Sequence, residues 1–462
     1  MLYFFVKAFF KSKRLALLSS FIAAIEPFFI AYSHQARNYS FSFFLTLLAT
    51  YLFLKIIEKE GKGISHYGLY IAYALLVGTC LLSHFLTFTV FIGHGLYVLL
   101  FFRKWQGWAR LAISMTIGMS IMALWMIYGA GQWTLENLED QAQVYRQAAL
   151  TNPYNNPFGV ILPATPKNVL VKAFPMFSDL FLFSNGLYEN LAGKKNGVLA
   201  LLVGLVLIVL YRGKFKKNFL SQWLAASGFG IMIISLFLYS QTPLLFGVMS
   251  VAIFLFYLLL ELLLEGYYSK PLLWFMVIMA FLPNLFLVVW SFRNGHTYGL
   301  TQRYGGFSFP YSIILVSLVL MQLGQIRTKL KYVIFTFLVV QMGYVLVLLG
   351  KIYADQSPKY TYFSKARRPN PYYDAAQKIQ AMYETGDTVK YPTYKYTFLT
   401  EKAKTFLPYS LQDAQLTNLY LPKDASYIQL IDTTEISKIV LVKAKNQQKL
   451  IIYDLEGQKH RY

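Results

Sequence analysis

The chain has 462 residues, of which 56% are hydrophobic and 14% are charged, and its formal net charge is +22 at pH 7. This composition excludes an ordinary soluble domain, in which about 25% of residues are charged, and it indicates a membrane protein. Cytoplasmic loops that face anionic lipid explain the positive charge, so nucleic acid is not an expected partner.

The first residues form a short apolar segment. Leu2–Phe10 is apolar apart from Lys7, and it is far too short to cross a bilayer. A signal peptide is not expected, because no small-residue cleavage site follows the segment. Two interpretations stay open: an interfacial segment at a true N-terminus, or the end of a helix whose beginning is missing.

Eleven apolar segments have the length and composition of membrane-spanning helices. The stretch 66–102 is too long for one helix, and we predict that it divides near Ser83-His84. The predicted spans are 15–33, 39–57, 66–83, 85–102, 108–129, 197–211, 219–239, 243–265, 271–292, 308–326 and 332–350.

The short loops between these spans differ in basic residues, and this difference predicts the orientation. Lys and Arg gather in every second loop, beginning with Lys11, Lys13 and Arg14, whereas the alternate loops hold only Arg37, Arg293 and Arg303. The first set is therefore predicted to be cytoplasmic. The outer face then receives the turn after residue 33, the loop 130–196, the loop 291–307 and the C-terminal tail.

Two larger segments are predicted on that outer face. Residues 130–196 are too long for a passive connection and are expected to form short helices, as a substrate-covering loop or a structural collar. Residues 352–462 read as a small α/β domain, with a helix over 372–383, a strand over 387–391 and a hairpin over 438–454. We predict a transmembrane domain over 1–351 and a soluble domain over 352–462.

Three local motifs suggest a function. The string Glu26–Ser40 ends one helix, turns outside as Tyr-Ser-His-Gln-Ala-Arg-Asn-Tyr-Ser and starts the next. Gln302-Arg303-Tyr304 precedes a helix that begins near Pro310, and His84 follows Ser83 inside an apolar stretch. In their order and sidedness these motifs resemble the GT-C glycosyltransferases, which include the protein O-mannosyltransferases and the lipid A aminoarabinose transferases. The resemblance covers essentially the whole chain.

The resemblance implies an activity and a site. Such enzymes move a sugar from a polyprenyl-phosphate carrier to a glycan, lipid or protein acceptor outside the cytoplasm, which places this chain in the inner membrane. An arginine suits the departing phosphate, because its planar fork matches phosphate oxygens and it stays charged. Glu26 lies at membrane depth, where an acid is a candidate site residue. The candidate catalytic residues are Arg37 and Glu26, and the candidate substrate-binding residues are His34, Tyr39, His84, Arg303 and Tyr304.

Two departures from the family pattern matter. Gln35 stands where the family often has Glu, and a glutamine cannot act as a base. The family also carries a catalytic Asp after an initial helix, and here the chain begins at what would be the end of the second helix. We therefore expect that the first two helices are missing, together with the general base. Without a second well-placed carboxylate, inversion is the expected stereochemistry.

Other readings stay open. A polysaccharide polymerase or ligase also pairs many helices with a long outer loop, and a membrane transporter would show broken helices and often internal repeats. An inactive scaffold is the third alternative, because the acid is missing. A divalent metal ion is conceivable for the enzyme, but no sequence feature supports one. His94 is expected to be a hydrogen-bonded residue of the helix core.

Overall fold

The structure is a computed structural model, and it divides into two compact units. It describes residues 1–33, 38–64, 66–129, 131–151, 153–154, 160–186, 194–212, 243–265, 268–326, 330–354, 371–392, 409–423, 426–432, 434–435 and 437–455. The first unit comprises Met1–Gln132, Thr165–Arg293 and Gly299–Lys365, and the second comprises Trp133–Ala164, Asn294–Tyr298 and Ala366–Tyr462. Each is described below by itself.

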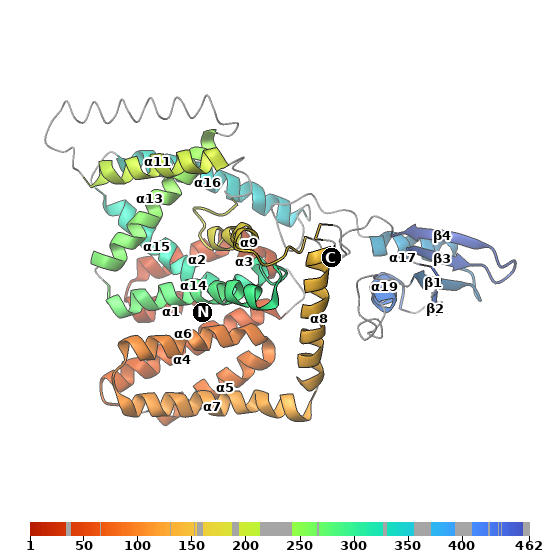
Figure 1. The fold of residues 1–462 in the computed structure, drawn as a ribbon, viewed down its shortest axis with the longest axis horizontal. Coiled ribbons are helices and arrows are strands. Elements are labelled where there is room, and N and C mark those ends of the chain that lie inside the picture. Colours follow the sequence, from red (N-terminus) through yellow and green to blue (C-terminus); the bar gives the residue numbers. More distant parts are fainter. Residues whose placement is uncertain are drawn as a thin grey trace. The chain divides into compact units, whose positions relative to one another are not determined.

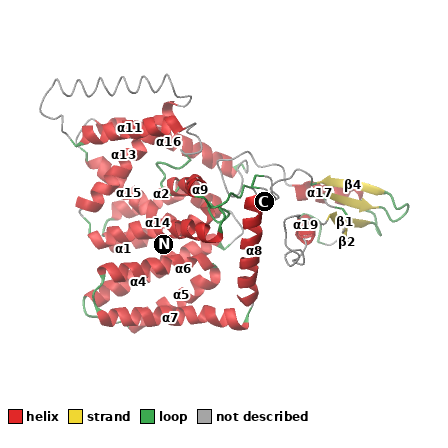
Figure 2. Ribbon diagram, viewed as in Figure 1, coloured by secondary structure: helices red, strands yellow, loops and turns green. Residues whose placement is uncertain are grey.

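The first unit is built from helices (Figures 1 and 2). In chain order the helices that lie wholly or mostly in it are α1 (Leu2–Phe10), α2 (Lys13–Ile25), α3 (Pro27–Ser33), α4 (Tyr39–Gly61), α5 (Tyr67–Ser83), the 3₁₀ helix η1 (Phe85–Thr87), α6 (Phe88–Phe101), α7 (Trp105–Tyr128), α9 (Pro166–Ser178), α11 (Lys194–Tyr211), α13 (Pro243–Glu265), α14 (Lys270–Asn294), the 3₁₀ helix η2 (Gln302–Ser308), α15 (Phe309–Gln325) and α16 (Leu330–Tyr353).

Six of the described helical stretches are long and apolar enough to cross a membrane: Tyr39–Gly61, Trp105–Tyr128, Phe246–Leu264, Lys270–Asn294, Gln302–Gln325 and Lys331–Tyr353. The chain is therefore a helical protein of the multi-pass membrane type, as the sequence indicates. The apolar helices α5, α6 and α11 are shorter, and the division at Ser83-His84 is confirmed because α5 ends at Ser83. The predicted span 219–239 lies outside the described residues, so the number eleven stays a prediction.

The predicted span 15–33 is not one continuous helix but a bent pair of helices. Helix α2 ends at Ile25, Glu26 is extended with φ −70° and ψ 113°, and α3 starts at Pro27. The two axes differ by 63°. The reason is local, because proline lacks the amide hydrogen that continues a helix and its ring disfavours helical geometry in the preceding residue. The break leaves an acidic side chain at the bend of a membrane helix.

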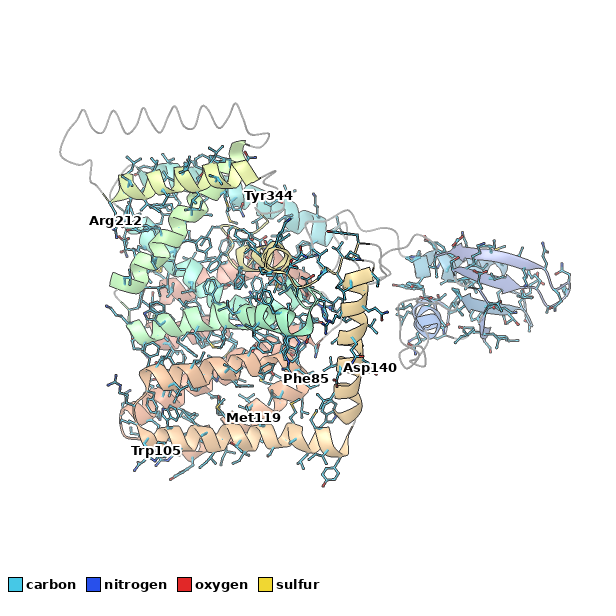
Figure 3. All side chains as sticks on the ribbon, in the orientation of Figure 1. Phe85, Trp105, Met119, Asp140, Arg212 and Tyr344 are labelled. Atoms are coloured by element: carbon cyan, nitrogen blue, oxygen red, sulfur yellow. The ribbon has the colours of Figure 1, made fainter. Side chains whose placement is uncertain are left out.

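Helix α15 lies at the centre of the first unit. Nearly all of its side chains are buried, and it packs against α2 and α13. Helix α7 is different, because it carries exposed apolar side chains along its length, Trp105 and Met119 among them (Figure 3). Apolar side chains that face outward are what a lipid-facing helix requires. Helix α15 thus forms the core of the bundle, and α7 has a surface suited to contact with lipid.

Helix α1 is packed into this unit rather than free. Phe5 and Val6 are fully buried, and Phe10 stacks edge-on against Tyr268 at a centroid distance of 5.5 Å. Lys11 ends the helix in a left-handed conformation with φ 55°. The short apolar segment predicted at the start of the chain therefore contributes to the helix core.

In the second unit, the described residues of the mid-chain loop pair with the connection after α14. Most of helix α8 (Gly131–Thr151) belongs here, and it agrees with the helices expected in this loop. Leu162 and Thr297 exchange backbone and side-chain hydrogen bonds at 3.0 Å. The rings of Tyr145 and Tyr298 stack at 3.8 Å. The loop therefore holds residues 294–298 by specific contacts.

The C-terminal part of the second unit is a small α/β fold. Its elements are α17 (Pro371–Met382), β1 (Thr388–Pro392), α19 (Tyr409–Asn418), β2 (Ile428–Asp432), β3 (Lys438–Val442) and β4 (Lys449–Asp454). The sheet order is β2-β1-β3-β4, with β1 parallel to β2 and antiparallel to β3. The predicted helix, strand and hairpin are confirmed. Gly386, with φ +98°, makes the turn between α17 and β1 that a side chain would strain.

A buried acid makes the stability of this fold depend on pH. The Asp413 carboxylate accepts a hydrogen bond of 2.7 Å from the Tyr372 hydroxyl, and burial raises the pKa of Asp413 to about 7. The folded state then binds more protons than the unfolded state between about pH 4 and pH 7. We expect the free energy of unfolding to fall by about 4 kcal/mol as the pH rises through that window, and to stay constant above it.

This expectation is measurable by hydrogen exchange of the β1–β4 amides in the full-length protein at several pH values. Asp413→Asn keeps an oxygen that accepts from Tyr372 but cannot ionise, so its exchange-derived stability is expected to be flat across the window. If the stability of this variant falls with pH as steeply as that of the wild type, Asp413 is not the group responsible.

Candidate functional site

The 3₁₀ helix η2 organises the candidate site. In a 3₁₀ helix, residues three apart lie on the same face. Gln302, Gly305 and Ser308 therefore share one face, Tyr304 and Phe307 share a second, and Arg303 and Gly306 share a third. The helix η2 thus has three faces, each formed by different residues.

The second face of η2 meets His84. The centroid of the His84 ring lies 6.2 Å from that of Tyr304, 5.5 Å from that of Phe307 and 5.4 Å from that of Tyr39. The sequence predicts Tyr39, His84 and Tyr304 as substrate-binding residues from three separate segments. The structure brings these three together.

Local hydrogen bonds orient His84. Its Nδ1 accepts from the Leu86 amide at 3.1 Å, where it caps η1. In a neutral imidazole this leaves the proton on Nε2, which is then a donor. The Asn38 side-chain amide donates to the Ser83 carbonyl, which joins the start of α4 to the end of α5. The ring is therefore held with a donor nitrogen available to a ligand oxygen.

Arg303 lies beside the same cluster. Its guanidinium is 4.5 Å from the Tyr304 ring centroid, a cation–π contact that fixes the side chain against the aromatic face. Arg303 is half-buried. The other two predicted residues of the outer turn, His34 and Arg37, lie outside the described residues. The structure thus places one of the two predicted phosphate-binding arginines.

Glu26 lies in a different cluster, formed by carboxyl and amide groups. Its side chain is 1% exposed, and its Oε1 accepts from the Asn185 amide at 2.8 Å. Its Oε2 has no hydrogen-bond partner among the described residues. The Asn185 amide also donates to the Asp179 carbonyl at 3.3 Å. Glu26 therefore does not contact the His84 cluster directly.

Asp179 joins this second cluster to η2. Its Oδ1 accepts from the Gly186 amide at 2.9 Å, and its Oδ2 accepts from the Gln302 amide at 3.3 Å. Asp179 is 2% exposed. Because Gln302 precedes Arg303, the carboxyl cluster and the arginine are held by adjacent residues of one short helix.

Asp179, Asn185 and Asn284 are not among the residues that the sequence analysis selected. Their signal is present but weak: an acid inside the apolar run 176–183, and an Asn inside the apolar helix α14. A polar side chain at membrane depth is a default candidate for function. The sequence does not show that Asn185 contacts Glu26, because the two residues are 159 positions apart.

Asn284 lies against the first face of η2. Its side chain is 0% exposed, and neither Oδ1 nor Nδ2 has a hydrogen-bond partner among the described residues. A Cβ placed on Gly305 would lie 2.4 Å from the Asn284 Oδ1. Ser308, one turn further on this face, also has a buried hydroxyl with no partner in the described part of the chain. The face therefore carries polar groups with unused hydrogen-bonding capacity.

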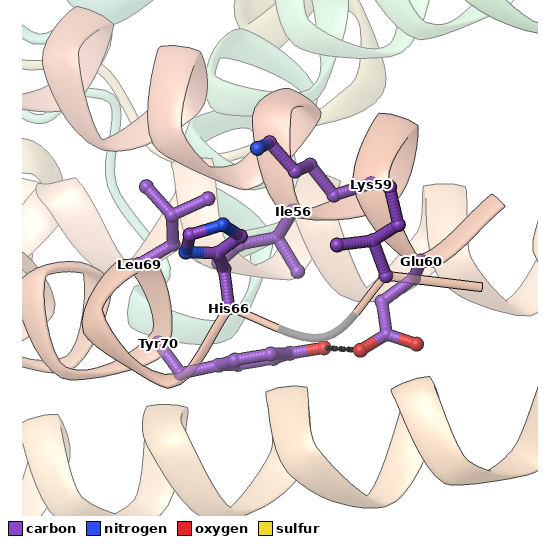
Figure 4. A pocket seen from close by; sticks show the side chains of 7 residues that line it. Ile56, Lys59, Glu60, His66, Leu69 and Tyr70 are labelled. Atoms are coloured by element: carbon purple, nitrogen blue, oxygen red, sulfur yellow. Dashed lines mark hydrogen bonds between the residues drawn. The ribbon is translucent and has the colours of Figure 1, made fainter. Parts of the chain in front are cut away.

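A small cavity lies at the ends of α4 and α5, away from this site (Figure 4). It is lined in part by Glu60, which accepts a 2.7 Å hydrogen bond from Tyr70 and forms a 2.7 Å ion pair with Arg110. Lys104 donates to the carbonyls of Glu60 and Gly61. These groups tie together two loops that are both predicted to be cytoplasmic. The cavity is therefore a packing junction between helices.

The described residues include no group of three or more His, Cys, Asp or Glu side chains that could hold a metal ion. The site instead offers one guanidinium, one imidazole donor and two buried carboxyl groups. In comparisons with known proteins, no family model, no curated protein and no solved structure matches this chain.

Proposed function

We propose that the protein is a membrane glycosyltransferase that moves a sugar from a polyprenyl-phosphate carrier to an extracytoplasmic acceptor. One observation carries the proposal: Tyr39, His84 and Tyr304 meet beside Arg303 although they come from three distant segments. These are the residues that the GT-C resemblance selects. Arg303 supplies permanent positive charge for the lipid phosphate, and the His84 Nε2–H supplies a donor for one of its oxygens.

The location of the cluster also supports a lipid-linked donor. Tyr39 begins α4, His84 follows α5 and Arg303 precedes α15, so the cluster lies at the ends of three apolar helices. A carrier lipid places its phosphate at such a boundary, with its tail in the hydrocarbon. We propose that this end faces outward across the inner membrane, as the basic loops predict, with the C-terminal fold on the same side.

The test is binding of a polyprenyl phosphate to the full chain in lipid nanodiscs. Arg303→Lys keeps the charge but loses the bidentate fork, and a hydrogen bond to a charged group contributes about 1.5–3 kcal/mol. We expect affinity to fall by roughly tenfold to a hundredfold. Arg293→Lys is the matched control, because Arg293 is exposed and lies over Trp290 at 4.7 Å. Equal affinities in all three proteins would overturn the phosphate site.

A second candidate function, transport, is favoured by one observation. Discontinuous helices with polar groups at the break are typical binding sites of secondary transporters, and Glu26 lies at a 63° break between α2 and α3. The two functions are separated by one comparison. Transfer of labelled sugar from a polyprenyl-phosphate donor in detergent supports the enzyme, whereas solute flux into sealed proteoliposomes without such transfer supports the transporter.

A further inference from the structure

Two buried carboxyl groups of the first unit bond to adjacent residues, Glu26 to the Asn185 side chain and Asp179 to the Gly186 amide. Glu26 and Asp179 are 1% and 2% exposed, and the Asn185 amide donates to the side chain of the first and the carbonyl of the second. Two negative charges this close together at low dielectric are costly, and neighbouring carboxyl groups commonly resolve this by holding one proton between them. The Glu26 Oε2, which has no partner among the described residues, is the natural place for that proton.

A separate observation indicates that a ligand belongs beside this pair. Asn284 is fully buried and both atoms of its amide lack partners in the described part of the chain. It abuts Gly305, which lies one 3₁₀ turn, about 6 Å, from Gln302. Gln302 in turn donates to Asp179. A buried amide without a partner is unfavourable. Because Asn284 and Asp179 meet the same face of η2, at Gly305 and Gln302, the geometry points to a hydroxyl-bearing group that both would bind.

We propose that Glu26 and Asp179 form the acid–base pair of the transfer reaction, and that the Asn284 amide holds the acceptor hydroxyl next to it. This inference rests on the proposed function and supplies the general base that the sequence motifs lack. Gln302, which donates to Asp179, is the residue before Arg303 on η2. The short helix η2 therefore contacts the carboxyl pair through Gln302 and carries the phosphate-binding Arg303.

The step balances with the groups that the proposal names. The acceptor oxygen forms a bond to the anomeric carbon, while the bond from that carbon to the phosphate oxygen breaks and its electron pair leaves with the lipid phosphate. The acceptor proton passes to the ionised member of the carboxyl pair. The pair then holds two protons and returns one to water before the next cycle. A positioned base of this kind contributes about a hundredfold to ten-thousandfold in rate.

The first experiment measures transfer by the purified full chain in nanodiscs, with a panel of polyprenyl-phosphate sugars. We expect Asp179→Asn and Glu26→Gln to lower turnover at least a hundredfold, while binding of polyprenyl phosphate stays within twofold of the wild type. Glu139→Gln, an exposed acid on α8, is the control and is expected to leave turnover unchanged. Full turnover in Asp179→Asn would overturn the assignment of the base.

The second experiment does not depend on turnover. A protonated carboxylic acid has an infrared carbonyl band that shifts in D₂O. At a pH well above 7, where Asp413 is ionised, we expect the wild type to show one such buried band that Glu26→Gln and Asp179→Asn each remove. A band that persists unchanged in both variants would overturn the shared proton. If the wild type transfers no sugar from any donor of the panel, the proposed function fails, whereas the infrared result still decides whether the pair holds a proton.

Discussion

Replacing His94 with alanine is expected to destabilise the helical unit by about 3–5 kcal/mol. His94 is 0% exposed and both ring nitrogens are bonded, Nδ1 to the Tyr73 hydroxyl at 2.8 Å and Nε2 to Thr50 at 3.0 Å. The Thr50 hydroxyl also forms a hydrogen bond of 2.6 Å with the Tyr311 hydroxyl, which extends the network. The variant removes a ring that stacks on Phe53 at 4.3 Å and leaves the buried Tyr73 hydroxyl without its hydrogen-bond partner.

The measurement is reversible unfolding in mixed micelles, with His94→Gln as the partial rescue because its amide can still bond to one neighbour. His66→Ala is the control, since His66 is exposed at the start of α5. If His94→Ala lowers the free energy of unfolding by less than about 1 kcal/mol, the four hydrogen-bonded side chains do not stabilise the unit together. The network joins α4, α5, α6 and α15, so it accounts for the hydrogen-bonded core histidine expected from the sequence.

Substituting alanine for Gly306 is expected to cost about 2–3 kcal/mol and to disturb the candidate site as well. A Cβ on Gly306 would lie 1.9 Å from the Phe43 Cζ. Phe43 has little room to move, because it is buried with ring contacts to Tyr39 at 6.3 Å and to Phe307 at 5.2 Å. Both of those residues contact His84, so a displaced Phe43 ring moves the surroundings of the imidazole.

Gly324→Ala is the matched control, because nothing lies within 4 Å of a Cβ at that position near the end of α15. Its stability is expected to stay equal or to rise by about 0.5–1 kcal/mol. Unfolding gives the first readout, and polyprenyl-phosphate binding by folded Gly306→Ala gives the second. A Gly306→Ala protein as stable as Gly324→Ala would contradict the close contact with Phe43.

The membrane helices were predictable because each is determined by local composition. A run of about 20 apolar residues satisfies its own backbone hydrogen bonds as a helix, whatever its neighbours are. Helices α13, α14 and α16 accordingly fall within three residues of the predicted spans. The break at Glu26 was also present in the sequence as Pro27, but the apolar run around it was read as continuous.

The candidate site was predictable in one part and not in the other. Tyr39, His84 and Tyr304 were found because they belong to recognisable motifs. Asp179 and Asn284 belong to no motif, and their importance comes from what they meet: Gln302 for the first and Gly305 for the second. Such contacts depend on how helices pack, which a hydropathy pattern does not determine.

The bend at Glu26 also has a consequence for the lipid around it. Helices α2 and α3 have 13 and 7 residues, about 20 Å and 10 Å at 1.5 Å per residue. Joined at 63° they reach only about 26 Å end to end, which is less than the hydrocarbon thickness of about 30 Å. Leu17 and Phe21 on α2 are exposed. If the bent pair crosses the membrane as one span, the bilayer beside it has to be thinner, and headgroups beside the pair lie nearer to the level of Glu26.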